Sequence, residues 1–258
     1  MATTVTSASP DATFGYRGTD GTTIIAYRWD TVGPPHAACQ LSHGMDEHAL
    51  RYSEFARALI AKGVVVYGQD HRKHGATARS VTELGRLGHG GCVEIGVVVL
   101  TGTAALDLLE PAFNLDQPIE LSALNTAFHP ARTDFDWLSW DESVVEAYIR
   151  DPLCSVALDM ESCKEMFLGA RRIIDPEALR QIHNELPIFI SVGDLDPLNQ
   201  KLTLVEALVG RFRLAGLKNV TVKVYHGARH EVLNEINRDV VVNDIWSWLE
   251  HAISNISS

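Results

Sequence analysis

Two residues whose types can act together in hydrolysis follow two late segments of the chain. Asp196 lies in the loop 193–197, after the apolar run 188–192, and His230 lies in the loop 227–231. A carboxylate can hold an imidazole in one tautomer, and an imidazole so held can act as a general base. Taken singly, each residue is more readily explained as part of a surface turn. Together, in the order acid then base, they predict two members of a catalytic triad.

A third loop, residues 43–48, follows the short apolar segment 38–42. Its His43-Gly44 pair would let the backbone approach a bound carbonyl group, and the N–H of Met45 could then donate to an oxyanion. A simple glycine turn explains the loop equally well when it is considered alone. Gly44 and Met45 are therefore the candidate oxyanion-hole residues.

Metal-ligating residue types are numerous, but their spacing does not favour a metal site. The four cysteines have no C-x-x-C spacing, so neither a zinc site nor a disulfide framework is indicated, and we expect reduced thiols. We expect no metal and no cofactor, and the histidines of the first half read as dispersed loop residues. These histidines are His36, His43, His48, His71, His74 and His89.

The composition favours one globular domain that acts on a small molecule. A chain of 258 residues with 46% hydrophobic residues can bury one sizeable core, so we expect a single domain over residues 1–258. The formal net charge of -11 argues against a nucleic-acid partner, because phosphate binding requires clustered Lys and Arg. The sequence contains no long apolar run, and residues 1–14 have neither a basic start nor an apolar stretch, so we expect a cytoplasmic protein.

Alternating apolar segments predict strands joined by helices, which would position the three loops. The predicted strands are residues 13–17, 22–29, 38–42, 64–67, 96–100, 187–192 and 220–225. The predicted helices are residues 52–62, 202–215 and 238–253. The first two strands flank a turn and predict a hairpin, whereas the later strand–helix–strand order predicts parallel pairing. The pattern is typical of an α/β fold, in which sites lie at the carboxyl ends of the strands.

Residues 107–180 interrupt this alternation. The segment loses the strand pattern, becomes irregular to helical, and contains prolines that break it as well as scattered aromatic residues. We interpret it as a helical cap inserted into the α/β domain.

Four motifs make the resemblance to a known family specific. They are HGMDEH at residues 43–48 with Arg51-Tyr52, DHRKHG at 70–75, GDLD at 193–196 and GARH at 227–230. The chain resembles the monoacylglycerol lipase and lysophospholipase branch of the α/β-hydrolases, also described as serine aminopeptidase-like, over nearly its whole length. The resemblance implies a mostly parallel sheet flanked by helices, and hydrolysis of monoacylglycerol, lysophospholipid or similar acyl esters through an acyl-enzyme.

The same resemblance assigns roles to individual residues. It implies that Asp196 is the triad acid, that His230 is the base and that Met45 supplies an oxyanion N–H. Residues 107–180 would form the cap that shapes an acyl-chain pocket and contacts a membrane surface transiently. The resemblance implies no cofactor, and the oligomeric state stays open.

The family's nucleophile elbow, G-x-S-x-G, is absent from this sequence. Residues 88–92 come nearest, with glycine where the serine would stand. A helix, the nucleophile strand and a second helix would need on the order of forty to fifty residues, which are missing around residues 92–96. We therefore expect the central nucleophile strand to be missing, with residues 81–87 as a poor single helix that joins the remaining strands.

The nucleophile is left unknown. Cys92 is the best chemical substitute, although no helix start is evident that would lower its pKa, whereas Ser42 and Ser191 are more readily structural. Two interpretations stay open: an ester hydrolase of the family, or a catalytically inactive relative that binds an apolar ligand or a protein partner. Aminopeptidase, dehalogenase or lactonase chemistry on the same fold is not distinguished.

A second departure from the family pattern is Lys73. The pattern D-x-R-G-x-G has glycine at this position. A lysine there is costly if the backbone requires a positive φ.

Overall fold

The computed structural model describes residues 9–18, 20–78, 97–117, 119, 121–154 and 159–256. The segments discussed above at residues 81–87 and 88–92, including Cys92, lie outside the described residues. The chain divides into two compact units. The first unit comprises Met1–Gly91 with Asp151–Leu158, and the second comprises Cys92–Arg150 with Asp159–Ser258.

The first unit contains a four-stranded sheet in the order β1-β2-β4-β3. Its strands are β1 (Ala12–Arg17), β2 (Thr23–Trp29), β3 (Ala37–Ser42) and β4 (Val64–Gln69). β1 and β2 form an antiparallel pair in which Arg17 lies opposite Thr23, and β3 pairs with β4 in parallel. The predicted hairpin and the predicted parallel unit are both confirmed.

The helix that connects β3 to β4 is α1 (Ser53–Ile60), preceded by a 3-10 turn at Ala49–Tyr52. Ala56 and Leu59, three residues apart, lie on its buried face, as expected for an amphipathic helix. The chain leaves the helix through Gly63, whose φ of 82° is in the left-handed region that glycine adopts without strain. The predicted helix and its glycine stop are therefore confirmed, with a shorter α-helical part.

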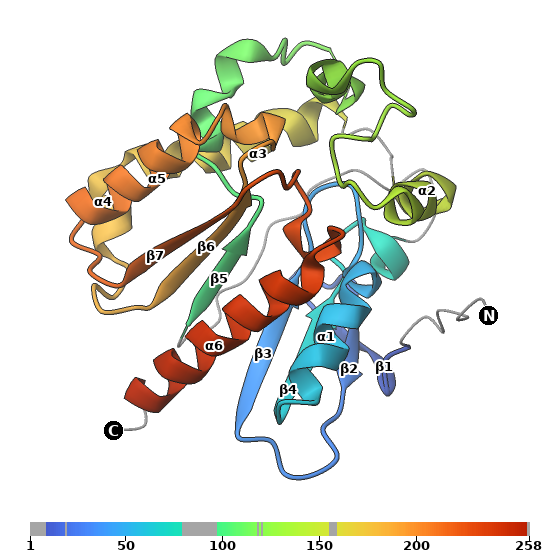
Figure 1. Ribbon diagram of the computed structural model, residues 1–258, viewed down its shortest axis with the longest axis vertical. Helices are drawn as coiled ribbons and strands as arrows, with labels where there is room; N and C mark the ends of the chain where they lie inside the picture. Colours follow the sequence, from blue (N-terminus) through green and yellow to red (C-terminus); the bar gives the residue numbers. More distant parts are fainter. Residues whose placement is uncertain are drawn as a thin grey trace. The chain divides into compact units, whose positions relative to one another are not determined.

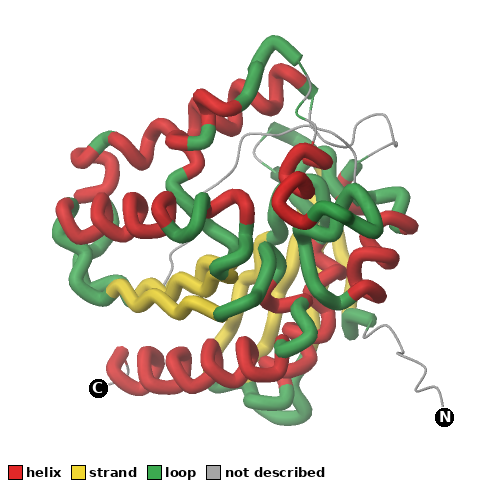
Figure 2. The backbone as a smooth tube through the Cα atoms, turned by 45° about the horizontal axis from the view of Figure 1, so that its top comes forward, coloured by secondary structure: helices red, strands yellow, loops and turns green. Residues whose placement is uncertain are grey.

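The second unit contains a three-stranded parallel sheet in the order β5-β6-β7. Its strands are β5 (Val98–Thr101), β6 (Ile188–Gly193) and β7 (Val220–Tyr225). All six residues of β6 are buried, as expected for the central strand of a parallel sheet that is covered on both faces. Helices α5 (Thr203–Leu214) and α6 (Arg238–Ile256) lie on opposite faces of this sheet, as Figure 1 and Figure 2 show.

Among the described residues, β3 pairs with β4 alone and β5 pairs with β6 alone. The segment where the central nucleophile strand is expected to be missing lies outside the described residues, so its absence stays a prediction.

Within residues 107–180, the described part contains helices and turns and no strand. The α-helices are α2 (Glu142–Arg150), α3 (Met160–Ala170) and α4 (Pro176–Arg180). The Asp159 side chain caps α3 by accepting a hydrogen bond from the N–H of Ser162 at 2.8 Å. The predicted loss of strands is confirmed. The role of the segment as a cap, and the single-domain organisation, stay predictions.

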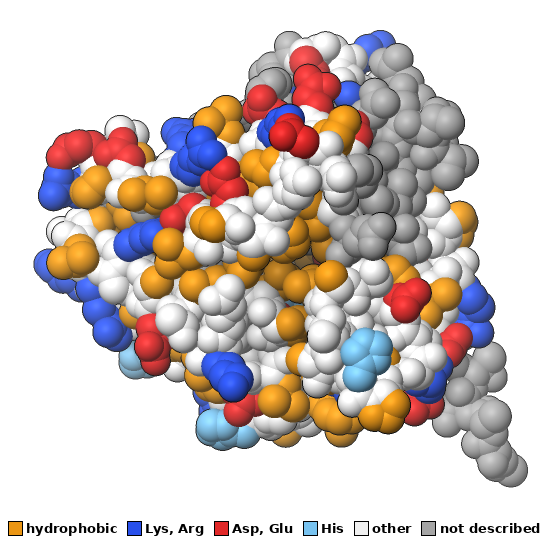
Figure 3. Space-filling view, turned by 90° about the horizontal axis from the view of Figure 1, so that it is seen from above, with side chains coloured by type: hydrophobic (Ala, Val, Ile, Leu, Met, Phe, Trp, Pro, Cys, Tyr) orange, Lys and Arg blue, Asp and Glu red, His pale blue; other side chains and the backbone are white. Residues whose placement is uncertain are grey.

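On the face shown in Figure 3, Lys and Arg side chains lie among acidic and hydrophobic ones and form no single continuous patch. In the described ranges, no helix combines the length and the apolar character that crossing a membrane requires.

Candidate active site

The two predicted catalytic residues meet in the second unit. Asp196 Oδ2 lies 2.9 Å from His230 Nδ1, and the carboxylate is fully buried whereas the imidazole side chain is 24% exposed. The other carboxylate oxygen accepts a hydrogen bond from the N–H of Leu198 at 2.9 Å, which fixes the plane of the carboxylate. Because Asp196 engages Nδ1, Nε2 is the nitrogen of His230 that could exchange a proton with a ligand.

Neighbouring strands bring these two loops together. Asp196 follows β6 and His230 follows β7, and the N–H of Leu195 donates to the carbonyl of Ala228 at 3.0 Å. The loops approach so closely at Gly193 that a Cβ there would lie 2.2 Å from the Ala228 carbonyl oxygen. A glycine at the end of β6 is therefore a requirement of the acid–base geometry.

Two residues that the sequence analysis did not identify also position the pair. Asn199 is fully buried, and its Nδ2 donates to the carbonyl of Gly193 at 2.6 Å, which anchors the loop that carries Asp196. Gly102, just after β5, has a φ of 56°, and a Cβ there would lie 2.9 Å from Cε1 of His230. Gly102 is far from the pair in sequence, so only the fold reveals its role, whereas Asn199 lies three residues after Asp196.

The loop of His230 is held by residues 137–140, which belong to the segment 107–180. The N–H of His230 donates to the carbonyl of Trp137 at 3.3 Å, and the N–H of Glu231 donates to that of Leu138 at 2.8 Å. The ring centroids of Trp137 and His230 are 5.0 Å apart. The insertion therefore fixes both the backbone and the ring plane of the candidate base.

Arg229, directly before the base, is buried between aromatic rings. Its guanidinium carbon lies 3.6 Å from the ring centroid of Trp140 and 4.4 Å from that of Phe128, a cation–π arrangement. Its Nη1 donates to the carbonyls of Asp136 and Ser139. Burial lowers the pKa of Arg229 from its ordinary value. Through these contacts, the Arg229 side chain connects the loop of His230 to the segment 107–180.

Glu235 completes this support. The carboxylate is fully buried, and Oε1 accepts a hydrogen bond from the N–H of Arg229 at 2.8 Å. Oε2 accepts from the N–H groups of Trp140 and Ile236, each at 3.1 Å. A buried carboxylate is tolerated because several donors compensate its lost hydration. Glu235 therefore connects the backbone directly before His230 to the backbone of Trp140.

The same loops carry a second aspartate–histidine pair with different surroundings. His226 Nδ1 lies 2.9 Å from Asp194 Oδ2, and the N–H of Gly227 donates to Asp194 Oδ1 at 2.7 Å. The His226 side chain is 88% exposed, so water solvates and screens the pair. This pair matches the contact geometry of Asp196 and His230 but lacks their burial.

The predicted oxyanion loop belongs to the first unit. The N–H of Gly44 donates to Glu47 Oε1 at 2.5 Å, and Glu47 in turn pairs with Arg51 at 2.6 Å and accepts from the Tyr52 hydroxyl at 2.7 Å. The Gly44 N–H is thus engaged within the loop. Among the described residues, the N–H of Met45 has no hydrogen-bond acceptor, so Met45 is the member of the predicted pair that keeps a backbone donor.

His43 clamps the loop after β3 to the loop after β4. Its Nε2 accepts from the N–H of His71 at 2.9 Å, its Nδ1 lies 2.7 Å from the carbonyl of Gly44, and the carbonyl of His43 lies 3.0 Å from Nε2 of His71. The proton of His43 is therefore assigned to Nδ1. Burial and the neighbouring imidazole of His71 lower the pKa of His43 to about 2. The clamp depends on a neutral imidazole.

Asp70 organises the loop that follows β4. Its carboxylate is fully buried and accepts from the Tyr27 hydroxyl at 2.8 Å and from the N–H of Ala49 at 2.9 Å. A Cβ at Gly75, whose φ is 47°, would lie 2.1 Å from Asp70 Oδ2. Lys73 has a φ of 60°, so the position where the family pattern has glycine does require a positive φ.

The described residues do not identify the nucleophile. Burial raises the pKa of Cys39 to about 11, and it also raises the pKa values of Cys154 and Cys163, so these free thiols are not activated thiolates. Ser191 is fully buried within β6, whereas Ser42 is exposed at the end of β3.

Together, the parallel pairing, the flanking helices and the acid and base loops after adjacent strands define an α/β-hydrolase. Solved structures share this fold. A thermostable carboxyl esterase from Bacillus coagulans superposes with a TM-score of 0.78 at 22% identity, over 94% of this chain and 98% of that protein. A monoglyceride lipase from Saccharomyces cerevisiae superposes with a TM-score of 0.69 at 14% identity, over 93% and 94% of the two chains.

The chain belongs to the serine aminopeptidase S33 family, whose model matches residues 33–94 and 98–237. It is 26% identical to a monoacylglycerol lipase of Mycolicibacterium smegmatis, over 91% of this chain and 95% of that relative. It is 25% identical to a monoglyceride lipase of Mus musculus, over 91% of this chain and 89% of that relative. The predicted branch of the α/β-hydrolases is thereby confirmed.

The comparisons also bear on the missing segment. The family match is interrupted between residues 94 and 98, where the elbow segment is expected to be absent. The alignment with the Mycolicibacterium smegmatis lipase spans 276 positions, more than the 258 residues of this chain, so that lipase has residues without a counterpart here. The interruption at residues 94–98 agrees with a shortened centre of the hydrolase sequence, and the alignment length agrees with missing residues without placing them.

Proposed function

We propose that this protein is a carboxylic-ester hydrolase that acts on monoacylglycerols, lysophospholipids or similar acyl esters. The observation that carries the proposal is the contact between the buried Asp196 carboxylate and Nδ1 of His230 at 2.9 Å. A carboxylate in this position holds the imidazole in the tautomer that a general base requires. The relatives named as monoacylglycerol lipases support an acyl ester as the substrate class.

In the proposed mechanism, a nucleophile adds to the ester carbonyl while Nε2 of His230 removes its proton. The N–H of Met45 would donate to the oxyanion that forms on the carbonyl oxygen. The C–O bond to the alcohol then breaks as His230 returns the proton to the leaving oxygen, which leaves an acyl-enzyme. Water, deprotonated by His230, releases the fatty acid and restores the nucleophile. The nucleophile is the one component without an assigned residue.

A second candidate function is binding without catalysis. It is favoured by the absence of a G-x-S-x-G motif and by the interrupted family match between residues 94 and 98. In that case the acid–base pair persists as a structural contact, and the protein binds an apolar acyl ligand or a protein partner.

The first experiment measures turnover of a p-nitrophenyl ester series of increasing acyl length by the purified full-length protein. Labelling with a fluorophosphonate probe accompanies it. We expect hydrolysis and labelling, both lost in His230→Ala and both retained in His226→Ala, the exposed histidine with the same type of contact. Mass spectrometry of the labelled peptide would then identify the nucleophile.

A folded protein with neither turnover nor labelling would contradict the hydrolase proposal. The second candidate function would then be tested by isothermal titration calorimetry with a non-hydrolysable ether analogue of monoacylglycerol. Saturable binding would support the binding function. Equal activity in wild-type protein and His230→Ala would reject the catalytic role of the pair.

A further inference from the structure

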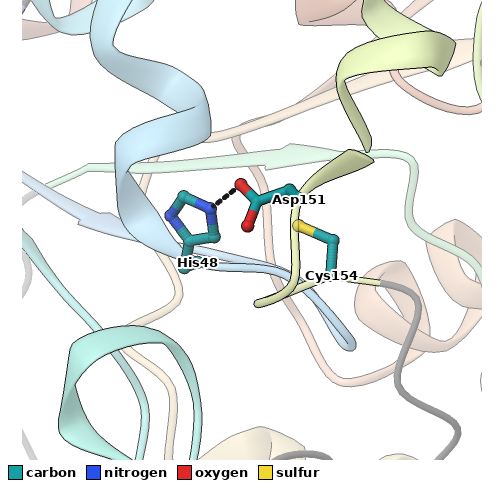
Figure 4. Close-up of side chains that lie close together, drawn as sticks. All are labelled: His48, Asp151 and Cys154. Carbon is teal, nitrogen blue, oxygen red and sulfur yellow. Dashed lines mark hydrogen bonds and ion pairs between the residues drawn. The ribbon is translucent and has the colours of Figure 1, made fainter. Parts of the chain in front are cut away.

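The first unit holds three metal-ligating side chains that the hydrolase mechanism does not use. His48, Asp151 and Cys154 each offer one ligand atom, and these atoms all lie within 4.8 Å of one another. Figure 4 shows the three side chains pointing toward one another, with His48 Nε2 at 2.8 Å from Asp151 Oδ2. His48 and Cys154 are buried, and Asp151 is partly exposed.

We propose that His48, Asp151 and Cys154 form a binding site for a divalent transition-metal ion of the zinc class. Imidazole nitrogen, carboxylate oxygen and thiolate sulfur are the three ligand types that Zn²⁺ takes in proteins. With metal–ligand bonds of about 2.0–2.3 Å, tetrahedral geometry places ligand atoms roughly 3.3–3.8 Å apart. The ligand atoms of His48 and Asp151 are 2.8 Å apart and all three ligand atoms lie within 4.8 Å of one another, so small side-chain movements make room for the ion, which replaces the hydrogen bond between His48 and Asp151.

The carboxylate is already oriented for this role. Asp151 Oδ1 accepts a hydrogen bond from the N–H of Leu153 at 2.9 Å, which directs Oδ2 toward His48. Hydrogen bonds of this kind hold a ligating carboxylate in place and are part of established metal sites. The Asp151 side chain is 29% exposed, which gives an ion a route from solvent to the two buried ligands.

The charges around the thiol favour a cation. The carboxylates of Asp46, Glu47 and Asp151 act electrostatically on the thiol of Cys154. The guanidinium of Arg51 acts on it with the opposite sign. Three carboxylates against one guanidinium leave this part of the loop negative. A bound Zn²⁺ ion with one thiolate and one carboxylate ligand is formally neutral, so ion binding offsets the negative charge.

The binding step is a proton exchange without a change of oxidation state. The S–H bond of Cys154 breaks, a metal–sulfur bond forms, and the proton leaves to solvent. The Nε2 proton of His48, which donates to Asp151 before the ion binds, is lost to solvent while Nδ1 carries the ring proton, so that Nε2 presents its lone pair to the metal. Three protein ligands leave the fourth position for a water molecule.

The site would also connect two separate stretches of the chain. Residues Asp151–Leu158 group with the first unit, although the residues on either side of them belong to the second. Ligation would tie this segment to the loop after β3 that contains His48. The sequence could not indicate this, because His48 and Asp151 are 103 residues apart and the expectation of no metal site was based on local spacing.

The test uses the full-length protein, stripped of metal with a chelator and titrated with Co²⁺. We expect one equivalent to bind with the visible d–d bands of tetrahedral Co²⁺ and a thiolate-to-cobalt charge-transfer band, both displaced by Zn²⁺. Cys154→Ser should lose the charge-transfer band and bind Co²⁺ at least about tenfold more weakly. Cys163→Ser, which removes a buried thiol from the second unit, should keep both.

Three results would overturn the proposal: no charge-transfer band in the wild-type protein, an unchanged band in Cys154→Ser, or a loss of the band in Cys163→Ser. Circular dichroism of each variant checks the fold. If Cys154→Ser does not fold, His48→Gln decides the matter, because weaker Co²⁺ binding supports the assignment and unchanged binding rejects it. Ester hydrolysis is not a readout, so the outcome is independent of the proposed enzymatic function.

Discussion

His230 in the second unit and His48 in the first each contact a carboxylate, at 2.9 Å and 2.8 Å, but their surroundings differ. His230 uses Nδ1 toward a fully buried aspartate, which leaves Nε2 for proton transfer. His48 uses Nε2 toward the partly exposed Asp151, with the thiol of Cys154 beside it. An aspartate–histidine contact therefore does not by itself determine the chemical role of the histidine. The ring nitrogen it engages and the groups around it separate the proposed general base His230 from the proposed metal ligand His48.

The loops that carry these histidines are also stabilised in different ways. In the second unit, the loop of His230 is held by the buried ionic groups of Arg229 and Glu235. In the first unit, the loop 43–48 is held to its neighbour by the neutral imidazole of His43. Removal of a charge should disrupt the first arrangement, whereas protonation should disrupt the second.

The largest expected effect separates the buried pair from the exposed pair beside it. Asp196→Asn should lower kcat for p-nitrophenyl ester hydrolysis by about 10³–10⁴-fold, because the amide stabilises the wrong tautomer of His230 and no longer balances the imidazolium. Asp194→Asn is the matched control and should leave kcat unchanged, because its partner His226 is exposed and screened. Equal losses in both variants would show that burial does not distinguish the two pairs.

The next largest effect concerns the ionic support of the His230 loop. Glu235→Ala should lower the free energy of unfolding by about 3–5 kcal/mol, because it leaves the buried N–H groups of Arg229 and Trp140 without their acceptor and removes a negative charge that acts on the buried guanidinium of Arg229. Urea denaturation measures the change. Glu250→Ala, on the exposed side of α6, should alter the same quantity by less than about 0.5 kcal/mol. A similar small change in both variants would contradict the proposed support.

Local patterns predicted the elements of both units and the contact between Asp196 and His230. Apolar runs indicate strands directly, and residues that follow adjacent parallel strands meet at one edge of the sheet. The hydrogen bond from the Gly44 N–H to Glu47 could also have been predicted from the sequence, because the acceptor is only three residues away.

The buried polar contacts could not be predicted in the same way. Glu235 accepts from Trp140 across 95 residues, and His48 contacts Asp151 across 103. In the sequence these side chains look like ordinary polar residues of surface turns. Their burial depends on how the insertion folds, and no periodic pattern encodes that arrangement.

Acid should weaken the first unit's loop selectively. The pKa of His43 is lowered by burial and by His71 to about 2, below its ordinary value of 6.5. Its contribution to stability is therefore complete above pH 6.5 and is lost as the pH falls from there toward 2, because the unfolded state binds the proton first. The loss should reach about 2 kcal/mol between pH 6.5 and pH 5. The pKa of His74 is also lowered by burial, so it acts with the same sign.

Hydrogen exchange followed by mass spectrometry checks this difference between the two loops. Peptides that cover residues 37–52 and 64–78 should lose protection between pH 7 and pH 5 after correction for the intrinsic exchange rate. Peptides that cover residues 220–235 should change less. In His43→Gln, which cannot be protonated, the loss in the first set should shrink. An equal loss in both sets would mean that the two loops do not differ in their response to acid.

The smallest expected effect concerns backbone strain beside the same loop. Around His230, the positive-φ positions Gly102 and Gly227 are glycines, whereas the loop after β4 has Lys73 at a φ of 60°. A left-handed conformation costs a lysine about 1–2 kcal/mol, and glycine avoids this while losing about 0.5–1 kcal/mol of unfolded-state entropy. Lys73→Gly should therefore raise the free energy of unfolding in urea by about 0.5–1 kcal/mol.

Lys62→Gly provides the matched control. Lys62 is an exposed lysine of the first unit, Lys73 is a partly exposed one, and only Lys73 has a positive φ. The same chemical change should there lower the free energy of unfolding by at least about 0.5 kcal/mol, since no relief of backbone strain offsets the entropic cost. Opposite signs for the two variants would show that the first unit tolerates strain at a position where a glycine would be more stable. If both substitutions destabilise equally, contacts of the Lys73 side chain outweigh the strain, and the lysine is a stabilising feature of the loop.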